Sequence, residues 1–242
     1  MKMAGLKEAA AITTALAALG LLAGCGGGDG GSSGATPTPA PQPAAALAGF
    51  WTTAAGDAAA LALESGEVWA IDTTGTAYKG QVSASGQSFS GTISGWQGTA
   101  KDTGSIQGSF VPKQSITATL RAPSIGTQNL QYQYVTGYDQ PANMQAYAGS
   151  YRADSGAMLS ISASGNVNGF VGTCGFSGTV TAAENGKNFF RFKLQYANAA
   201  ACGYFSGKAT EGIAAPVDAK TLYTAEVATD GSAGSPNRLV KQ

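Results

Sequence analysis

The feature that most restricts the fold of this chain is an internal repeat at a spacing of about 100 residues. Residues 46–51 (ALAGFW) recur as residues 146–151 (AYAGSY). Two further elements recur in the same order. Leu61, Leu63 and Ser65-Gly66 match Leu159, Ile161 and Ser164-Gly165, and residues 89–93 match residues 176–180. The Phe-Ser-Gly sequence of the second element occurs a third time at residues 205–207. Solenoid units are usually about 20–50 residues long, so a longer repeat predicts two similar domains.

Within each half, apolar and polar residues alternate as they do in β-strands. In one such run, Arg191, Lys193 and Gln195 alternate with four apolar residues: Phe190, Phe192, Leu194 and Tyr196. This period of two is typical of a strand with one buried face. Pairs with the composition of two-residue hairpin turns lie between such runs: Ser65-Gly66, Thr74-Gly75, Ser164-Gly165 and Asn185-Gly186.

We count about eight candidate strands in each half. Eight short antiparallel strands suit a small up-and-down barrel, which closes on itself and leaves no exposed sheet edge. The predicted fold is therefore all-β, with a first barrel-like domain at residues 47–137, a connector at 138–146 and a second barrel-like domain at 147–242. A single helical turn is expected in the connector, within residues 140–146.

Residues 1–24 have the features of a lipoprotein signal peptide. Lys2 and Lys7 precede an apolar run at residues 9–23, which is shorter than the roughly 20 residues of a membrane span and is typical of an export signal. The run ends in Leu22-Ala23-Gly24-Cys25, which resembles the lipobox of bacterial lipoprotein precursors. In that family the cysteine receives lipid and becomes the new N-terminus. The alternative is an ordinary export signal followed by an incidental cysteine.

Residues 25–46 are then expected to form a lipidated cysteine and a Gly/Pro-rich tether. Residues 26–35 are rich in glycine and residues 36–43 in proline, and together they reach on the order of 40 Å. The family's cysteine carries three acyl chains, and several chains anchor a protein stably to a membrane where one does not. Gly26 stands where an aspartate commonly retains such proteins at the inner membrane, so the resemblance implies the outer membrane, on its periplasmic face or at the cell surface.

The layout of the whole mature chain resembles a group of bacterial outer-membrane lipoproteins. The shared elements are the lipobox, the tether, a Leu-Ala-Gly-x-Trp opening (residues 47–51), a Tyr-Asp-x-Pro junction (residues 138–141), and a second half with Cys174, residues 176–179 and Cys202. The openings at residues 49–51 and 149–151 are also similar to those of lipocalin- and avidin-like barrels. These motifs are structural, and the resemblance brings no established activity with it.

Cys174 and Cys202 are predicted to form a disulfide. Oxidation is the default in an exported protein, and the two cysteines flank a predicted hairpin of residues 176–181 and 189–196, which places both at the same end of the sheet. On the chain-entropy estimate, closing this loop stabilises the fold by about 3.6 kcal/mol. The alternative, a metal-binding or redox pair, has no CxxC spacing and no histidine to support it.

Composition excludes several classes of function. The chain has no histidine, and the commonest hydrolase triads need an imidazole base. Its 14 basic and 14 acidic residues balance, which argues against a nucleic-acid partner. Motifs for a cofactor or a metal ion are absent from the sequence. Glu64 and Glu67 flank a predicted turn and form a candidate carboxylate pair, although a solvated hairpin tip explains them equally well.

Four aromatic residues of the first half are candidates for lining a ligand cavity: Trp51, Trp69, Tyr78 and Trp96. Eight-stranded barrels hold one small ligand or fill with side chains, and inward-facing aromatic residues are more often core. The leading hypothesis is a membrane-anchored binding or structural module of the bacterial envelope that is not an enzyme. The alternative is a carrier of a small apolar ligand, which an enclosed cavity around Trp51 and Trp69 would favour. An enzyme using carboxylates or a Ser-Lys pair is the least favoured.

Overall fold

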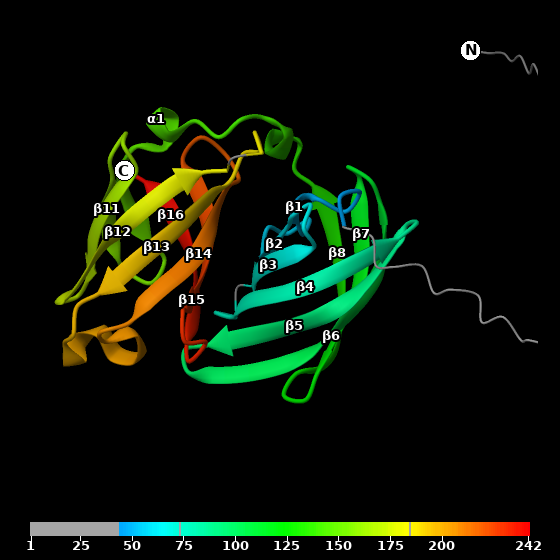
Figure 1. Ribbon diagram of the computed structural model, residues 1–242, viewed down its shortest axis with the longest axis horizontal. Coiled ribbons are helices and arrows are strands. Elements are labelled where there is room, and N and C mark those ends of the chain that lie inside the picture. The colour runs from blue at the N-terminus through cyan, green and yellow to red at the C-terminus, as the bar shows by residue number, and fades with distance from the viewer. Residues whose placement is uncertain (1–43, 73, 184) are drawn as a thin grey trace, which may run out of the picture. The chain divides into compact units, whose positions relative to one another are not determined.

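The structure, a computed structural model, describes residues 44–72, 74–183 and 185–242. They form two closed barrels of antiparallel strands (Figure 1). The first contains β1 (Gly49–Thr52), β2 (Ala58–Ala62), β3 (Glu67–Asp72), β4 (Ala77–Ser85), β5 (Ser88–Gln97), β6 (Ala100–Val111), β7 (Ser115–Ala122) and β8 (Gly126–Tyr134). The second contains β9 (Gly149–Ala153), β10 (Met158–Ile161), β11 (Asn166–Val171), β12 (Cys174–Ala182), β13 (Phe190–Tyr196), β14 (Ala209–Pro216), β15 (Thr221–Ala228) and β16 (Gly234–Lys241).

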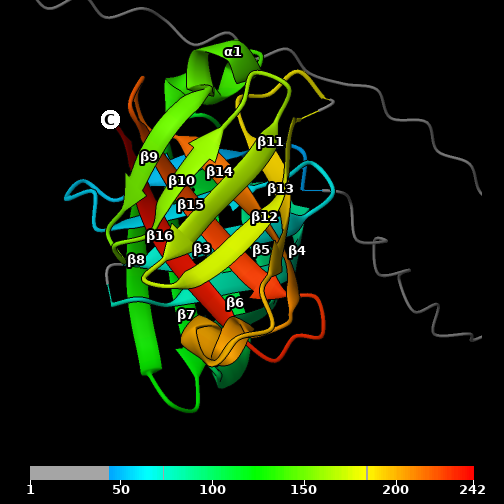
Figure 2. The same ribbon diagram turned by 90° about the vertical axis from the view of Figure 1, so that its left-hand side faces the viewer.

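Each strand pairs with its neighbours in the chain, and the barrels are closed by pairing of β1 with β8 and of β9 with β16. The predicted all-β fold of two up-and-down barrels is therefore confirmed. Two short helices, η1 (Thr136–Asp139) and α1 (Met144–Tyr147), lie in the connector, and η2 (Ala200–Phe205) joins β13 to β14. Figure 2 shows α1 at one end of the second barrel and η2, drawn in orange, at the opposite end.

The proposed signal peptide, Cys25 and residues 26–43 of the predicted tether lie outside the described residues. Ala44, placed in the tether by the sequence, is fully buried in the hydrophobic core of the first barrel. The hydrophobic core of the first barrel thus includes a residue that lies three positions before the predicted boundary. None of the helices in the described ranges is long and apolar enough to cross a membrane.

The repeated opening sequences, residues 46–51 and 146–151, form equivalent hydrogen bonds in the two barrels. Trp51 Nε1 donates to the carbonyl oxygen of Leu47 at 3.2 Å, and Tyr151 Oη donates to that of Tyr147 at 2.7 Å. Both rings are 0% exposed. An aromatic polar atom that reaches back four residues therefore anchors the first strand of each barrel.

The repeated Phe-Ser-Gly element, in contrast, is not structurally equivalent. Residues 89–93 lie on β5, the fifth strand of the first barrel, whereas residues 176–180 lie on β12, the fourth strand of the second. Residues 205–207 begin at the end of η2 and are not in a strand. Gly91 and Gly178 share only the requirement for a residue without a Cβ, because a Cβ at either would lie about 2 Å from a backbone oxygen of a neighbouring strand.

The turns between strands also differ from the prediction. Leu63 N donates to Glu67 O at 2.8 Å and Gly66 N donates to Leu63 O at 2.9 Å, which closes a loop of residues 64–66. Residues 163–165 close in the same way. These are three-residue loops with a glycine at positive φ in the third position, the arrangement that places a bulge beside the turn. The predicted two-residue turns at these sites were wrong by one residue.

The two barrels share a hydrophobic cluster, and both belong to one compact unit. Outward-facing residues of the first barrel supply Phe50, Trp69, Ile71 and Trp96, and the second barrel supplies Phe189, Ile213, Ala215 and Val227. Strands β14 and β15 consequently have almost every residue buried after their first few. Strands covered on both faces read as near-continuous apolar runs.

The Tyr-Asp-x-Pro junction holds the barrels together. Tyr138 is 2% exposed and stacks on Phe189 of the second barrel, with ring centroids 6.3 Å apart. The carboxylate of Asp139 accepts from Lys113 Nζ of the first barrel at 2.7 Å and from Lys187 Nζ of the second at 2.8 Å. These hydrogen bonds hold the pKa of Asp139 well below its usual range.

Candidate ligand-binding cavity

The four aromatic residues proposed to line a cavity do not converge. Trp51 and Tyr78 face the interior of the first barrel, where Trp51 packs edge-on against Tyr134 at 5.0 Å and Tyr78 Oη donates to Asp72 at 2.9 Å. Trp69 and Trp96 lie on the opposite face of the sheet, in the cluster shared by the barrels. Trp96 Nε1 donates to Gly231 O of the second barrel at 3.0 Å. A cavity built around Trp51 and Trp69 is therefore excluded.

The candidate carboxylate pair is also separated. Glu67 binds Arg191 at 2.6 Å and accepts from Trp69 Nε1 at 2.6 Å. Glu64 accepts from Asn185 at 2.9 Å. Burial raises the pKa of Glu67, but the hydrogen bonds from Arg191 and Trp69 outweigh it and leave the pKa below its usual value. Both carboxylates thus bind the second barrel. Elsewhere in the described ranges, Cys, Asp and Glu form no group of three that suits a metal ion.

The first barrel contains a cavity of about 440 Å³ whose two carboxylates already have partners. Asp72 accepts from the backbone nitrogens of Thr74 and Thr76, each at 3.0 Å, and Asp57 accepts from Thr53. The carboxylates at this cavity are therefore accounted for by the local turns.

The second barrel encloses a cavity of about 310 Å³ with a mainly apolar lining. All four residues of the alternating run on β13 face it, as the sequence pattern predicts for one buried face. Other apolar residues that line it are Ile161, Val167, Phe176, Val180, Leu222 and Leu239. Met144 and Tyr147 of α1 line it as well, as do residues 201–205 of η2. Small-molecule sites are typically cavities of about 300–1,000 Å³ with this kind of lining.

A carboxylate projects into this apolar space. Glu226, on β15, is 6% exposed and accepts from Tyr196 Oη at 3.0 and 3.2 Å and from Thr210 Oγ1 at 3.1 Å. Burial raises the pKa of Glu226 to about 7, and the two hydroxyl donors only partly oppose that rise. Burial and the neighbouring Glu226 carboxylate in turn raise the pKa of Tyr196 well above its usual range.

Further polar groups lie beside Glu226 on the inner face of β15 and β16. The register pairs Glu226 with Ser235 and Thr224 with Asn237, and all four line the cavity. Asn237 Oδ1 is buried and has no hydrogen-bond partner, although buried polar atoms are nearly always paired. Glu226 is the only charged side chain among the described residues that line the cavity. The site is thus an apolar chamber with one small polar patch.

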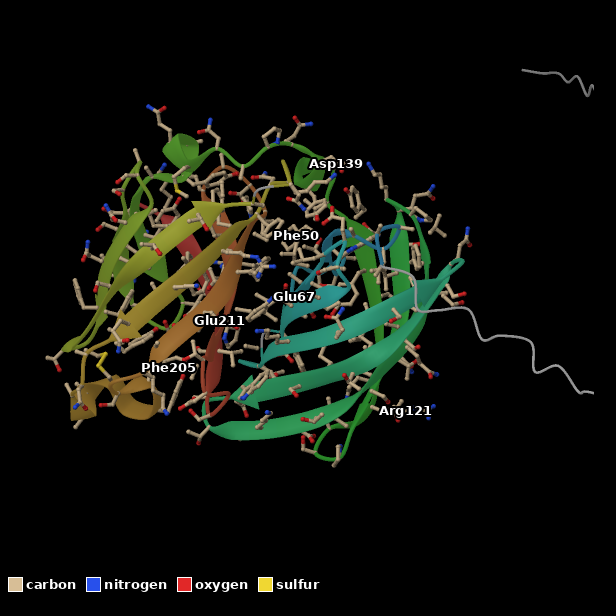
Figure 3. All side chains as sticks on the ribbon, viewed as in Figure 1. Phe50, Glu67, Arg121, Asp139, Phe205 and Glu211 are labelled. Carbon is tan, nitrogen blue, oxygen red and sulfur yellow. A yellow bond between two sulfur atoms is a disulfide. The ribbon has the colours of Figure 1, made fainter. Side chains whose placement is uncertain are left out.

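The predicted disulfide between Cys174 and Cys202 is confirmed, with a Cα–Cα distance of 4.8 Å. It ties η2 to the start of β12 at one end of the cavity, where Figure 3 labels Phe205. The ring of Phe205 stacks on Tyr196, with centroids 4.8 Å apart. Because Cys202 and Phe205 both line the cavity, η2 forms a covalently fixed cover over this end.

Glu226 and Asn237 are not among the candidate residues predicted from the sequence. The available signal was a period-two run in which Leu222, Thr224 and Glu226 alternate with Tyr223, Ala225 and Val227. Glu226 falls at one of the inward-facing positions of this run. Because Glu is almost never fully buried unless it is paired, an acidic residue at such a position indicates a candidate functional site. No protein-family model, curated protein or solved structure matches this chain, so function is argued from the cavity itself.

Proposed function

We propose that this protein is a lipid-anchored binding module of the bacterial envelope whose second barrel holds a small, mainly apolar molecule. The observation that supports this function is the cavity of about 310 Å³ enclosed by that barrel. Its apolar walls favour the transfer of a hydrocarbon or aromatic group from water, by roughly 25 cal/mol per Å² of apolar surface buried. The polar patch around Glu226 supplies orientation and specificity.

The anchor part of the proposal is supported by the sequence. Leu22-Ala23-Gly24-Cys25 resembles a lipobox, and residues 26–43 have the composition of a tether. Acyl chains on Cys25 would bind the outer membrane, and the absence of aspartate at position 26 favours that membrane over the inner one. A binding barrel on a tether can meet its ligand in the space beside the membrane surface, on whichever side it is exposed.

The binding function is tested with prodan, an uncharged naphthalene dye whose emission shifts to the blue in apolar surroundings. The full chain carries Cys25→Ser, so that its own acyl chains do not compete for the cavity. We expect a blue shift that saturates with one dye per chain. Leu194→Trp, which fills the second cavity, removes this binding. The matched control is Leu130→Trp, because Leu130 is also a half-buried leucine and lines the cavity of the first barrel.

Each result has a clear meaning. Loss of dye binding in Leu194→Trp alone supports the second barrel as the site. Loss in Leu130→Trp alone would move the site to the first barrel. A chain that gives no saturable shift would refute the binding function. Thermal unfolding of both variants checks that each remains folded under the assay conditions.

A further inference from the structure

We propose that the molecule held by the second barrel is an apolar amine, with a hydrocarbon or aromatic body in the chamber and one protonated amino group bound to Glu226. This inference rests on the proposed binding function and names the class of its ligand. It follows from the hydrogen-bond acceptors and the charges on the cavity wall.

Two acceptors of the polar patch, the Glu226 carboxylate and Asn237 Oδ1, have unused hydrogen-bonding capacity. A carboxylate has about four lone-pair sites, and Glu226 receives donors from two side chains, Tyr196 and Thr210. Asn237 Oδ1, on the next strand, receives none. A ligand group that binds these two acceptors brings hydrogen-bond donors, and an ammonium group brings three.

The charges around the cavity favour a cation. The other titratable side chains that line it are the tyrosines of α1, β13 and η2, namely Tyr147, Tyr196 and Tyr204. Residues 209–216 of β14 contribute Thr210 to the Glu226 site, and β16 contributes Ser235 and Asn237, none of which is charged. No Lys or Arg among the described residues lines the cavity, so the chain itself provides no counter-ion for Glu226.

A purely structural role explains this arrangement less well. A buried carboxylate without a cation destabilises a fold, and an apolar residue of similar volume is often neutral or better. Here Glu226 faces an open space of about 310 Å³ that no side chain fills. A carboxylate kept at the wall of such a space is suited to a positively charged ligand group, and it disfavours an anionic group through like-charge repulsion.

The inference also fixes the direction of the pH dependence. Burial raises the pKa of Glu226 to about 7 in the empty barrel, whereas an alkyl amine, like the Lys side chain, stays protonated to about pH 10. The ion pair therefore forms more completely as pH rises from 6 to 8. A carboxylic acid shows the opposite trend, because it binds best while Glu226 is protonated.

The test compares n-octylamine, 1-octanol and octanoate, which share a tail and differ only in the head group. Binding is measured by calorimetry at pH 8 with the full chain carrying Cys25→Ser. We expect octylamine to bind about 10- to 100-fold more tightly than octanol, as a charge-assisted hydrogen bond does, and octanoate to bind most weakly. Glu226→Gln removes the preference for octylamine and leaves octanol binding unchanged. The matched control, Glu211→Gln on the outer face of β14, leaves both unchanged.

The outcomes separate the two proposals. Equal binding of the three compounds, or tightest binding of octanoate, would overturn the amine inference and leave the binding function standing. No binding of any of the three would refute the binding function itself. If Glu226→Gln does not fold, the pH dependence of octylamine binding to the chain with Glu226 in place tests the inference. Octylamine binding that tightens about tenfold from pH 6 to 8 supports the inference, and a flat profile contradicts it.

Discussion

Gly66 and Gly165 occupy the same backbone position in the two barrels. Their φ angles are +84° and +83°. The carbonyl oxygen of Gly66 accepts from Val82 N at 2.8 Å, and that of Gly165 accepts from Val180 N at 2.7 Å. A Cβ at either glycine would lie 2.2 Å from the carbonyl oxygen of the same valine. The internal repeat is therefore a repeat of backbone geometry, in which β12 corresponds to β4.

Replacing either glycine with alanine is expected to destabilise the fold severely. A positive φ disfavours a Cβ by about 1–2 kcal/mol, and the clash with a fixed carbonyl oxygen adds to that. Gly66→Ala and Gly165→Ala should each lower the free energy of unfolding by more than about 2 kcal/mol, measured by urea denaturation. Gly156→Ala is the control, because Gly156 has a φ of +85° and open space around its Cβ position. An equal loss in all three variants would show that the valine contact is unimportant.

The strands and the disulfide can be predicted from sequence because each depends on a local pattern, whereas closure of the barrels depends on pairing of distant strands, such as Trp51 with Tyr134. The run from Phe190 to Tyr196 alternates strictly, and the structure buries one side of it. Cys174 and Cys202 flank one hairpin, so that pairing its two strands brings the cysteines together. Where one face is buried and the other solvated, the period of two is enough to identify the inner face.

The pattern fails where both faces of a strand are covered. On β3, Val68 faces the barrel interior while Trp69 and Ile71 face the second barrel. All of them are apolar, and the sequence does not tell which side is inside. The same ambiguity applies to β15, where residues on both faces are buried. The inward-facing position of Glu226 was therefore not predicted. Some contacts between the barrels join residues more than a hundred positions apart, such as Lys79 and Glu211 at 2.6 Å, and no local sequence pattern predicts them.

The two lysines that bind Asp139 should contribute unequally to stability. Lys187 and Asp139 both have 27% of the side chain exposed, whereas Lys113 has 64% exposed, and solvent screens exposed pairs. A double-mutant cycle of Asp139→Asn with Lys187→Met should give a coupling of about 1 kcal/mol, and the cycle with Lys113→Met at most about 0.5 kcal/mol. Chemical denaturation at low salt provides both values.

These couplings should also depend on pH. Because the pKa of Asp139 is lowered in the folded state, the stabilisation is present above the unfolded pKa of about 4 and is lost as pH falls through the folded value. Stability measured at pH 7 and pH 3 should therefore fall less in Asp139→Asn than in the unsubstituted chain. A coupling for Lys113 as large as that for Lys187 would contradict the role of burial.

Breaking the disulfide should loosen the cover that η2 forms over the cavity. Cys174→Ser combined with Cys202→Ser is expected to lower the free energy of unfolding by about 2–4 kcal/mol and to speed the release of bound prodan, followed by stopped-flow fluorescence. In the chain with Cys25→Ser, Cys174 and Cys202 are the only cysteines, and they should resist alkylation until reduced. Lower stability with an unchanged release rate would show that η2 does not control access.

Glu226→Gln should stabilise the empty protein at alkaline pH. Because the pKa of Glu226 is raised from 4.5 to about 7 in the folded state, its favourable contribution is complete below pH 4.5 and is lost as pH rises through 7. At pH 8 the variant should therefore be more stable by a few kcal/mol, and near pH 5 the difference should be small. Thermal unfolding of the variant and the unsubstituted chain across this range provides the comparison. A variant less stable than the unsubstituted chain at pH 8 would mean that the carboxylate is well satisfied without a ligand.

Cys25→Ser should move the protein from the membrane fraction to the soluble fraction. Residues 26–43 then carry no lipid, and a tether of this composition has no apolar surface of its own to bind a bilayer. Gly26→Ala is the control, because it changes the neighbouring residue and leaves the thiol in place. Intact-mass measurement should find added acyl mass in the unsubstituted chain and in Gly26→Ala, and none in Cys25→Ser. Membrane binding that persists in Cys25→Ser would show that the protein is held by another route, and the cavity would then have to be considered apart from any anchor.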